Sequence, residues 1–262
     1  NFTGTAGQQR VPTSFLQEAL IPVPPLEEQR RIVDLLARAE GIVRLGRDAQ
    51  QKATELIPAI FIDMFGDPAT NPKGWRIASF GSTGTLDRGK SRHRPRDAAE
   101  LYGGPYPFIQ TGDVANSGGR IRTYAATYSD VGLSQSRLWR AGTLCITIAA
   151  NIAKTGVLEF DACFPDSVVG FVPGDQIAVP YAQAWLGFLQ PTLEANAPQA
   201  AQKNINLEIL RALPIPVPPI EAQVKFADRC ERAWSISRQQ ADAQEKAASV
   251  FAALLAGSFQ DA

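Results

Sequence analysis

A run of basic residues is the most chemically suggestive stretch of this sequence. Residues 88–96 read Arg-Gly-Lys-Ser-Arg-His-Arg-Pro-Arg, with five Lys or Arg in nine positions. Gly89 and Pro95 predict a loop. Cations at this spacing suit a row of phosphates, where each neutralised phosphate releases a counterion. A solvated surface loop is the alternative interpretation. The candidate nucleic-acid contacts in this loop are Arg88, Lys90, Ser91, Arg92, Arg94 and Arg96.

Other polar side chains follow at several later positions. The segment 110–114, Gln-Thr-Gly-Asp-Val, comes directly after a predicted strand, and its hydroxyl and carboxylate groups suit contacts to phosphates or base edges. Ordinary turn chemistry is the alternative. In the major groove Arg pairs with guanine, and Asn or Gln with adenine. The candidate base contacts are Thr111, Asp113, Arg120, Arg122, Asn151 and Gln202, and further phosphate contacts are Lys154 and Lys203.

No arrangement of residues predicts catalysis or a metal site. The only histidine, His93, lies in the basic run without an acidic or cysteine partner at ligand spacing. Cys145, Cys163 and Cys230 are odd in number and lack CxxC spacing, which argues against a disulfide framework or zinc and favours a reducing compartment. The sequence has no GxxxxGK[ST] loop for ATP and no Asn/Asp-Pro-Pro-aromatic motif for holding a flipped adenine. We therefore expect no enzyme activity, no metal and no cofactor.

Composition places the chain among globular proteins. Its 262 residues are 45% hydrophobic and 20% charged, which is enough to bury a core. No apolar run reaches 18 residues, so no membrane span is predicted. The net charge is zero, but residues 73–203 hold 13 Lys and Arg against 10 Asp and Glu. A bound polyanion would therefore meet this middle segment.

The elements that carry these residues are organised by an internal repeat. Residues 21–29, Ile-Pro-Val-Pro-Pro-Leu-Glu-Glu-Gln, recur at 215–223 as Ile-Pro-Val-Pro-Pro-Ile-Glu-Ala-Gln, an offset of 194 residues. The chain therefore reads as a repeat unit, an insert and a second repeat unit. The insert has no second copy.

Each repeat unit predicts a proline stop followed by a long helix. Prolines exclude helix before them, and acidic residues suit a helix start, so we expect helices from about Leu26 and Ile220. Apolar or small residues then recur at alternating steps of three and four, which predicts two seams that pack on each other. Two amphipathic helices on one globular core are the alternative. Pro58 should kink or end the first helix.

The insert predicts a compact α+β domain. Short alternating runs between turn residues predict six strands, at 75–77, 107–109, 120–124, 143–148, 156–160 and 168–172. Helix is predicted at 180–190 and 207–212 only. Cys145 falls within one of the apolar strands, where it should serve packing.

These motifs resemble a known family. The run Pro-Val-Pro-Pro-Leu-Glu-Glu-Gln-Arg-Arg-Ile at 22–32 and its echo at 216–223 each follow a Gln-containing tail and precede a long helix. In this they resemble the specificity subunit of type I restriction-modification enzymes. Gly74-Trp75 and the segment Tyr-Pro-Phe-Ile-Gln-Thr-Gly-Asp at 106–113 are similar to that family's target-recognition domain. The resemblance covers essentially the whole chain, and it is weakest inside the insert.

The resemblance implies a fold and a set of domains. A complete subunit of that family has two target-recognition domains held apart by two antiparallel spacer helices. We therefore expect an α+β chain, in which a mixed α/β target-recognition domain is attached to a two-helix antiparallel coiled coil. The expected boundaries are the tail of a preceding recognition domain at 1–20, spacer helix 1 at 21–66, the recognition domain at 67–213 and spacer helix 2 at 214–262.

The resemblance also implies a function. Such a subunit recognises double-stranded DNA, each domain reading one half-site, and methyltransferase (M) subunits that modify adenine and restriction-translocase (R) subunits assemble on it in the cytoplasm. With one recognition domain, this chain is a half-subunit that forms a homodimer, a piece of a longer polypeptide or a natural truncation. A coiled-coil protein-interaction scaffold without DNA binding is the alternative function.

Overall fold

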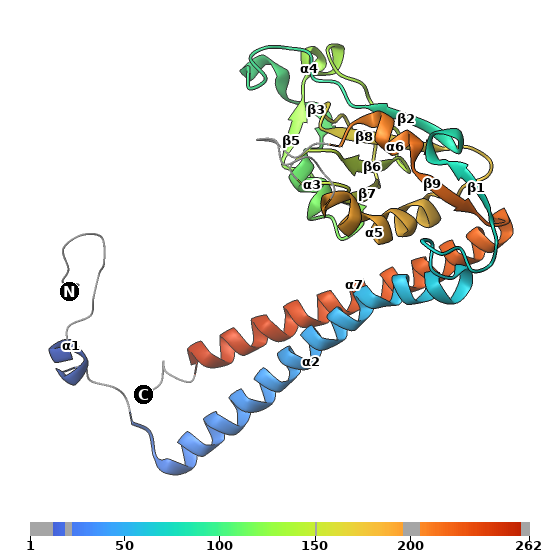
Figure 1. Cartoon of the computed structure of the whole chain (residues 1–262). Coiled ribbons are helices and arrows are strands. Elements are labelled where there is room, and N and C mark those ends of the chain that lie inside the picture. The colour runs from blue at the N-terminus through green and yellow to red at the C-terminus, as the bar shows by residue number, and fades with distance from the viewer. Residues whose placement is uncertain (1–12, 19–22, 150, 196–204, 258–262) are drawn as a thin grey trace. The chain divides into compact units, whose positions relative to one another are not determined.

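The computed structural model describes residues 13–18, 23–149, 151–195 and 205–257 (Figure 1). Contacts divide the chain into two compact units. Residues 1–54 and 236–262 form the first unit, and residues 55–235 form the second. The long helices α2 (Leu26–Phe65) and α7 (Ile220–Gly257) each contribute to both units.

The first unit contains a pair of antiparallel helices. It holds the short helix α1 (Thr13–Glu18), the beginning of α2 and the end of α7, and these parts of α2 and α7 run side by side in opposite directions (Figure 1). A Cβ atom on Gly46 would lie 3.4 Å from the Cβ of Gln244, so a small residue at 46 lets the axes approach closely. The expected pairing of two helices is confirmed.

Both long helices begin where the sequence predicts. α2 starts at Leu26 and α7 at Ile220, directly after the two Pro-Pro pairs. The first turn of α2 carries Glu27 and Glu28, as the positive end of a helix dipole favours. These starts are set by local sequence, because a residue before proline is excluded from helix.

Pro58 was expected to kink or end the first helix, and of these two outcomes the helix end is wrong. α2 continues through Pro58 to Phe65 and stops before Gly66, whose φ of 81° is a left-handed conformation that glycine adopts freely. Proline inside a helix costs about 3 kcal/mol. Beyond it, Phe61 and Phe65 are 0% and 3% exposed, and burying two such side chains contributes a comparable or larger amount.

The second unit is built on a five-stranded sheet in the order β2-β8-β6-β7-β4. Neighbouring strands are antiparallel except for β4 and β7, which are parallel. Its strands are β2 (Gly84–Arg88), β4 (Arg120–Ile121), β6 (Leu144–Thr147), β7 (Thr155–Leu158) and β8 (Val168–Pro173). The strand expected at 120–124 is thus only two residues long, and β2 was not predicted.

Two small sheets flank the larger one. β1 (Arg76–Ser79) pairs antiparallel with β9 (Pro214–Val217), and β3 (Tyr102–Phe108) pairs antiparallel with β5 (Ala126–Tyr128). The second proline-rich segment is therefore a strand as well as a helix stop. A two-stranded sheet tolerates its prolines, because each strand needs hydrogen bonds on one edge only.

Helices complete the second unit. α5 (Val179–Ala195) and α6 (Leu207–Ala212) confirm the two helices predicted in the insert. Sequence patterns missed α3 (Thr111–Ala115), α4 (Asp130–Ser134) and the 3-10 turns η1 (Phe80–Ser82) and η2 (Ala99–Leu101). These elements are at most five residues long, too short for a helical period to show.

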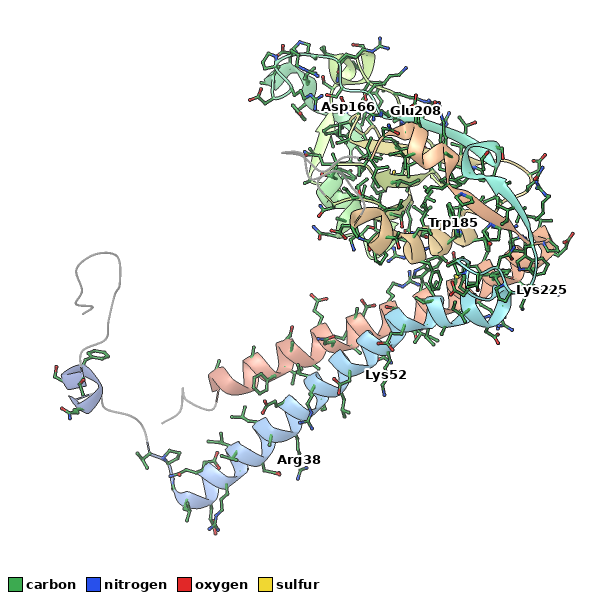
Figure 2. All side chains as sticks on the ribbon, in the orientation of Figure 1. Arg38, Lys52, Asp166, Trp185, Glu208 and Lys225 are labelled. Carbon is green, nitrogen blue, oxygen red and sulfur yellow. The ribbon has the colours of Figure 1, made fainter. Side chains whose placement is uncertain are left out.

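Aromatic side chains join the helices of the second unit to its sheet. The Phe61 ring of α2 lies 5.7 Å from Phe226 of α7 and 5.2 Å from Tyr181 of α5, measured between centroids. Trp185 of α5, labelled in Figure 2, is 1% exposed and lies 5.1 Å from Phe80. The end of α2, the start of α7 and helix α5 therefore share one core with the sheet.

Cys145 is buried, as its predicted packing role requires, and so are the other two cysteines. Cys145, Cys163 and Cys230 are all free. Across the described ranges, no helix combines the length and apolar content of a membrane span.

Candidate nucleic-acid interface

The basic loop that follows β2 is held at several backbone positions. Gly89 N–H donates to the Val168 carbonyl at 2.9 Å, and Lys90 N–H donates to the Phe164 carbonyl at 3.0 Å. The Gln135 side chain accepts from the backbone N–H of Arg92 at 2.5 Å. A Cβ on residue 89 would lie 2.1 Å from the Phe164 oxygen, so glycine is required there. The loop therefore presents its side chains from a fixed backbone.

The side chains of this basic loop divide into occupied and free groups. Arg94 Nη1 donates to the carbonyls of Ser91 and His93 at 2.8 and 2.7 Å, and Ser91 is only 7% exposed. Arg96 pairs with Asp166, labelled in Figure 2, at 3.0 Å. The remaining cations, Arg88, Lys90 and Arg92, are exposed and form no side-chain hydrogen bond or ion pair with the described residues.

Helix α3 carries Thr111 and Asp113 and separates two surface pockets. Its start is fixed because Asp113 Oδ2 accepts from the Gln110 backbone N–H at 2.7 Å, while Val114 is buried. One pocket, of about 200 Å³, is lined by Ser91, Arg96, Tyr102, Phe108, Gln110, Thr111, Pro165 and Ser167. The other, of about 220 Å³, is lined by Gly112, Asp113, Asn116, Ser117, Arg120, Ile121, Arg122 and Thr123. The fold thus brings the basic loop, the α3 turn and β4 to adjoining sites.

Arg120 and Arg122 have different surroundings, although both line the larger pocket. The Arg120 side chain is 19% exposed, and its guanidinium pairs with Glu231 and lies 4.1 Å from the centre of the Trp234 ring. Arg122 is 42% exposed and donates through Nε to Glu159 at 3.0 Å. Arg122 therefore retains free guanidinium N–H groups at the surface, whereas Arg120 is largely engaged by α7.

Two other predicted contacts, Asn151 and Lys154, do not line these pockets. Both are exposed on the loop between β6 and β7. The loop is closed by its own hydrogen bonds, since Lys154 N–H donates to Thr147 Oγ1 at 3.1 Å. Gln202 and Lys203 lie outside the described residues.

Sequence reasoning missed several residues that shape this surface. The aromatic side chains Tyr102 and Phe108 line the smaller pocket, and Glu159 joins the two arginines of the larger one. Of these residues, only Phe108 had a signal in the sequence, because it belongs to a predicted strand that precedes a polar turn. The partners of Arg120 had none, because Glu159 lies 39 residues and Glu231 lies 111 residues further along the chain.

Buried ionisable groups in this unit do not suggest chemistry. Burial, together with the neighbouring Glu231 carboxylate and against the opposing effect of Arg120, raises the pKa of the Cys230 thiol to about 12. The thiol therefore stays protonated at neutral pH. Within the described ranges, no group of three or more His, Cys, Asp or Glu side chains is placed to hold a metal ion.

Comparisons with known proteins agree on one family. A specificity subunit assigned to the type I restriction enzyme MjaX of Methanocaldococcus jannaschii is 20% identical over 235 residues, or 85% of this chain and 54% of that protein. The chain thus spans about half the length of this curated relative. The crystal structure of an HsdS subunit from Thermoanaerobacter tengcongensis is 25% identical, with a TM-score of 0.55 over 98% of this chain and 64% of that one.

Two further solved structures share the fold at lower identity. A chain of the type I R-M system, solved to explain its complex assembly and conformational transition, is 24% identical with a TM-score of 0.66, covering 97% of this chain and 64% of that one. The S subunit of the type I system of M. genitalium is 14% identical with a TM-score of 0.61, covering 97% and 67%.

The family match falls on the unit that carries the candidate interface. The profile of the type I restriction modification DNA specificity domain matches residues 72–237, well over half of the chain. This range holds the basic loop, α3, both pockets and the start of α7. The α+β domain and the paired helices both agree with the solved relatives. The chain belongs to the type I restriction modification DNA specificity domain family.

Proposed function

We propose that this chain is a sequence-specific double-stranded DNA recognition subunit of a type I restriction-modification system. Its second unit would read one half-site, and the chain would position an adenine methyltransferase beside it. The observation that carries this proposal is the coincidence of the family match at 72–237 with the unit that presents the free cations and both polar pockets.

The free cations of the basic loop are the best candidates for phosphate contacts. Arg88, Lys90 and Arg92 extend from a backbone held by the sheet, so little further ordering is needed when they meet a phosphate. Arg94 and Arg96 already spend their guanidinium groups on the loop and on Asp166, so we assign them a supporting role. Lys154 and Lys203 are proposed as outlying phosphate contacts.

The candidate base contacts gather at the two pockets. Arg122 offers exposed guanidinium N–H groups, which suit the O6 and N7 acceptors of guanine in the major groove. Thr111 and Asp113 lie on the short helix between the pockets, where a hydroxyl donor and a carboxylate acceptor are available. Asn151, which lines neither pocket, and Gln202 are proposed to read adenine.

Mobility shift with a mixed-sequence duplex at low salt tests the function directly. Retardation of the duplex is expected, and selection from a random duplex pool with the methyltransferase subunit present should then enrich one half-site. No retardation at low salt would support the alternative, a coiled-coil scaffold without DNA binding.

A matched pair of triple variants tests the phosphate contacts. Replacing Arg88, Lys90 and Arg92 by alanine should weaken binding to every sequence and reduce the slope of log K against log salt by about 0.9 for each phosphate that is no longer neutralised. The control replaces three exposed arginines of α2, Arg30, Arg38 and Arg44, and removes the same charge. An equal weakening in both variants would show a general charge effect rather than an interface at the loop.

The proposed partners follow from the family. We infer that methyltransferase subunits bind this chain and that restriction-translocase subunits join the assembly, in the cytoplasm where foreign DNA enters. The chain itself would carry no active site, so DNA incubated with it and S-adenosylmethionine should gain no methyl group until the methyltransferase subunit is added. A homodimer would supply a second recognition unit, and sedimentation of the chain with and without duplex DNA tests that state.

A further inference from the structure

Arg120 is the least exposed of the arginines predicted to contact DNA, and its environment suggests another role. Its guanidinium lies over Trp234, 4.1 Å from the ring centroid, and forms an ion pair with Glu231 one turn earlier on α7. A carboxylate and an aromatic face stabilise this guanidinium, and only its Nε is buried without a hydrogen-bond partner among the described residues. To read a base it would have to leave both, and breaking these two interactions would oppose binding.

Glu159 connects this partly buried arginine to the more exposed Arg122. Glu159 Oε1 lies 3.5 Å from Arg120 Nη1 and 3.0 Å from Arg122 Nε. The four charged groups therefore form an alternating row that runs from Glu231 on α7 to Arg122 at the pocket. Because Nε of Arg122 is fixed by Glu159, its outer N–H groups face a defined direction.

A second set of contacts holds the same segment from α5. Gln183 is 8% exposed, and its Nε2 donates to the Gly119 carbonyl at 2.7 Å. The start of α5 is in turn held by Gln223 of α7, whose Oε1 accepts from Ala178 N–H at 2.9 Å. Residues 117–122 are thus attached to α7 directly through Arg120 and indirectly through α5.

We propose that Arg120, Glu231 and Trp234 form a positioning set that fixes the segment 117–122, and with it the exposed Arg122, against helix α7. The inference rests on the proposed function, since it assigns the set a role in sequence discrimination. Arg120 would not touch DNA, and its effect would pass through the Glu159 carboxylate to Arg122. The pocket that holds Arg122 would keep its shape only while α7 holds the segment.

The decisive variant is Glu231→Gln, because a positioning role and simple electrostatics predict different changes in DNA binding. Removing a carboxylate near a polyanion should by itself strengthen binding to all DNA. A positioning role instead predicts a loss of sequence preference. The affinity for the selected duplex, divided by that for a scrambled duplex of the same composition, should fall about tenfold. One well-placed arginine supplies discrimination of this size. Asp228→Asn is the matched control, an exposed acid three residues earlier in α7 without an ion pair among the described residues.

Hydrogen exchange without DNA separates failure of this inference from failure of the proposed function. Amides of 117–122 and the paired Val157 and Glu159 amides should exchange faster in Glu231→Gln than in Asp228→Asn or the unsubstituted chain. Equal exchange in all three proteins overturns the inference whatever the DNA result. If the unsubstituted chain prefers no duplex sequence, the proposed function is refuted. The role of Arg120, Glu231 and Trp234 in sequence discrimination is then refuted as well.

Substitution of Trp234 completes the test with a conservative replacement. Trp234→Phe keeps an aromatic face under Arg120 and should keep most of the sequence preference, while Trp234→Ala should lose about as much preference as Glu231→Gln. Both are compared at temperatures where circular dichroism shows each protein folded. Preference that falls equally with Phe and Ala, or with neither, contradicts a role for the arginine–ring contact.

Discussion

The two proline-led helix starts share almost the same sequence, yet they lie in different surroundings. Gln29 and Gln223 are related by the 194-residue offset, and each donates through Nε2 to the carbonyl five residues before it, at 2.8 Å in both copies. Gln223 is fully buried and also contacts Gln176 and Ala178. Gln29 has only the local contact among the described residues.

Apolar positions repeat the same contrast. Phe226 is fully buried in the core of the second unit, while its counterpart Ile32 is only partly covered. Val23 and Leu26 of the first copy are 74% and 60% exposed. The motif therefore encodes a helix start in both copies, whereas burial depends on the domain that covers it. Paired substitutions in the two copies test that distinction.

Truncation of the covered aromatic ring should have the largest effect. Phe226→Ala removes a buried ring that contacts Phe61 and Phe65, and it should lower the free energy of unfolding by about 3–5 kcal/mol. Ile32→Ala, the matched change in the first copy, should cost no more than about 1 kcal/mol. Urea unfolding followed by circular dichroism measures the helices of both units, while tryptophan fluorescence reports the second unit alone, which contains all four tryptophans. Similar values for the two variants would remove the contrast.

The two glutamines should differ next. Gln223→Leu leaves the Ala178 N–H and the Gln176 carbonyl without their partner inside the protein, and should cost about 2–3 kcal/mol. Gln29→Leu removes one local hydrogen bond and should cost less than about 1 kcal/mol. Thermal unfolding followed by circular dichroism provides the comparison. A larger destabilisation by the Gln29 substitution would mean that the first copy is also covered.

A polar residue at the first helical position should have a smaller effect. Leu26→Gln changes an exposed side chain and should alter the unfolding free energy by less than about 0.5 kcal/mol. Ile220→Gln, on a half-buried side chain, should cost about 1 kcal/mol. Parallel urea titrations measure both changes in unfolding free energy. Equal changes would show that the partial burial of Ile220 does not stabilise the protein.

Thiol reactivity gives the mildest test. Cys230 is fully buried and its pKa is raised to about 12, so it should react with a maleimide only slowly at neutral pH and faster as pH rises toward that value. Leu36 occupies the matching position of the first copy and is partly exposed. Leu36→Cys should therefore be modified first, as mass spectrometry of peptides would show. Faster modification at Cys230 would contradict its burial.

Local signals in the sequence predicted local structure correctly. The starts of both long helices followed from proline and acidic residues, because those preferences act within one turn. Alternation of apolar residues found β6 and β8, which lie in the middle of the sheet and are almost wholly buried. The resemblance at the proline-rich repeats predicted the family, and the match at 72–237 confirmed it.

Predictions failed where distant residues decide the outcome. Pro58 does not end α2, because Phe61 and Phe65 are buried against α5 and α7. β9 was missed because its strand partner, β1, lies about 140 residues earlier and its prolines suggested coil. Arg120 was predicted to contact a base, because no residue near it in the sequence indicates that Glu231 and Trp234 engage its guanidinium. Side-chain partners of this kind depend on the finished fold.

The contacts of Gln223 have a consequence for how this protein can diversify. Its side chain meets only main-chain atoms: the Pro218 and Gln176 carbonyls and the Ala178 N–H. Every residue supplies a backbone carbonyl, and every residue except proline supplies a backbone N–H. These hydrogen bonds of Gln223 therefore do not depend on the side chains of the residues that it contacts. The surface that we propose to contact DNA can therefore change in sequence while helix α7 stays attached, so the proposed specificity and the stability of the fold depend on separate residues.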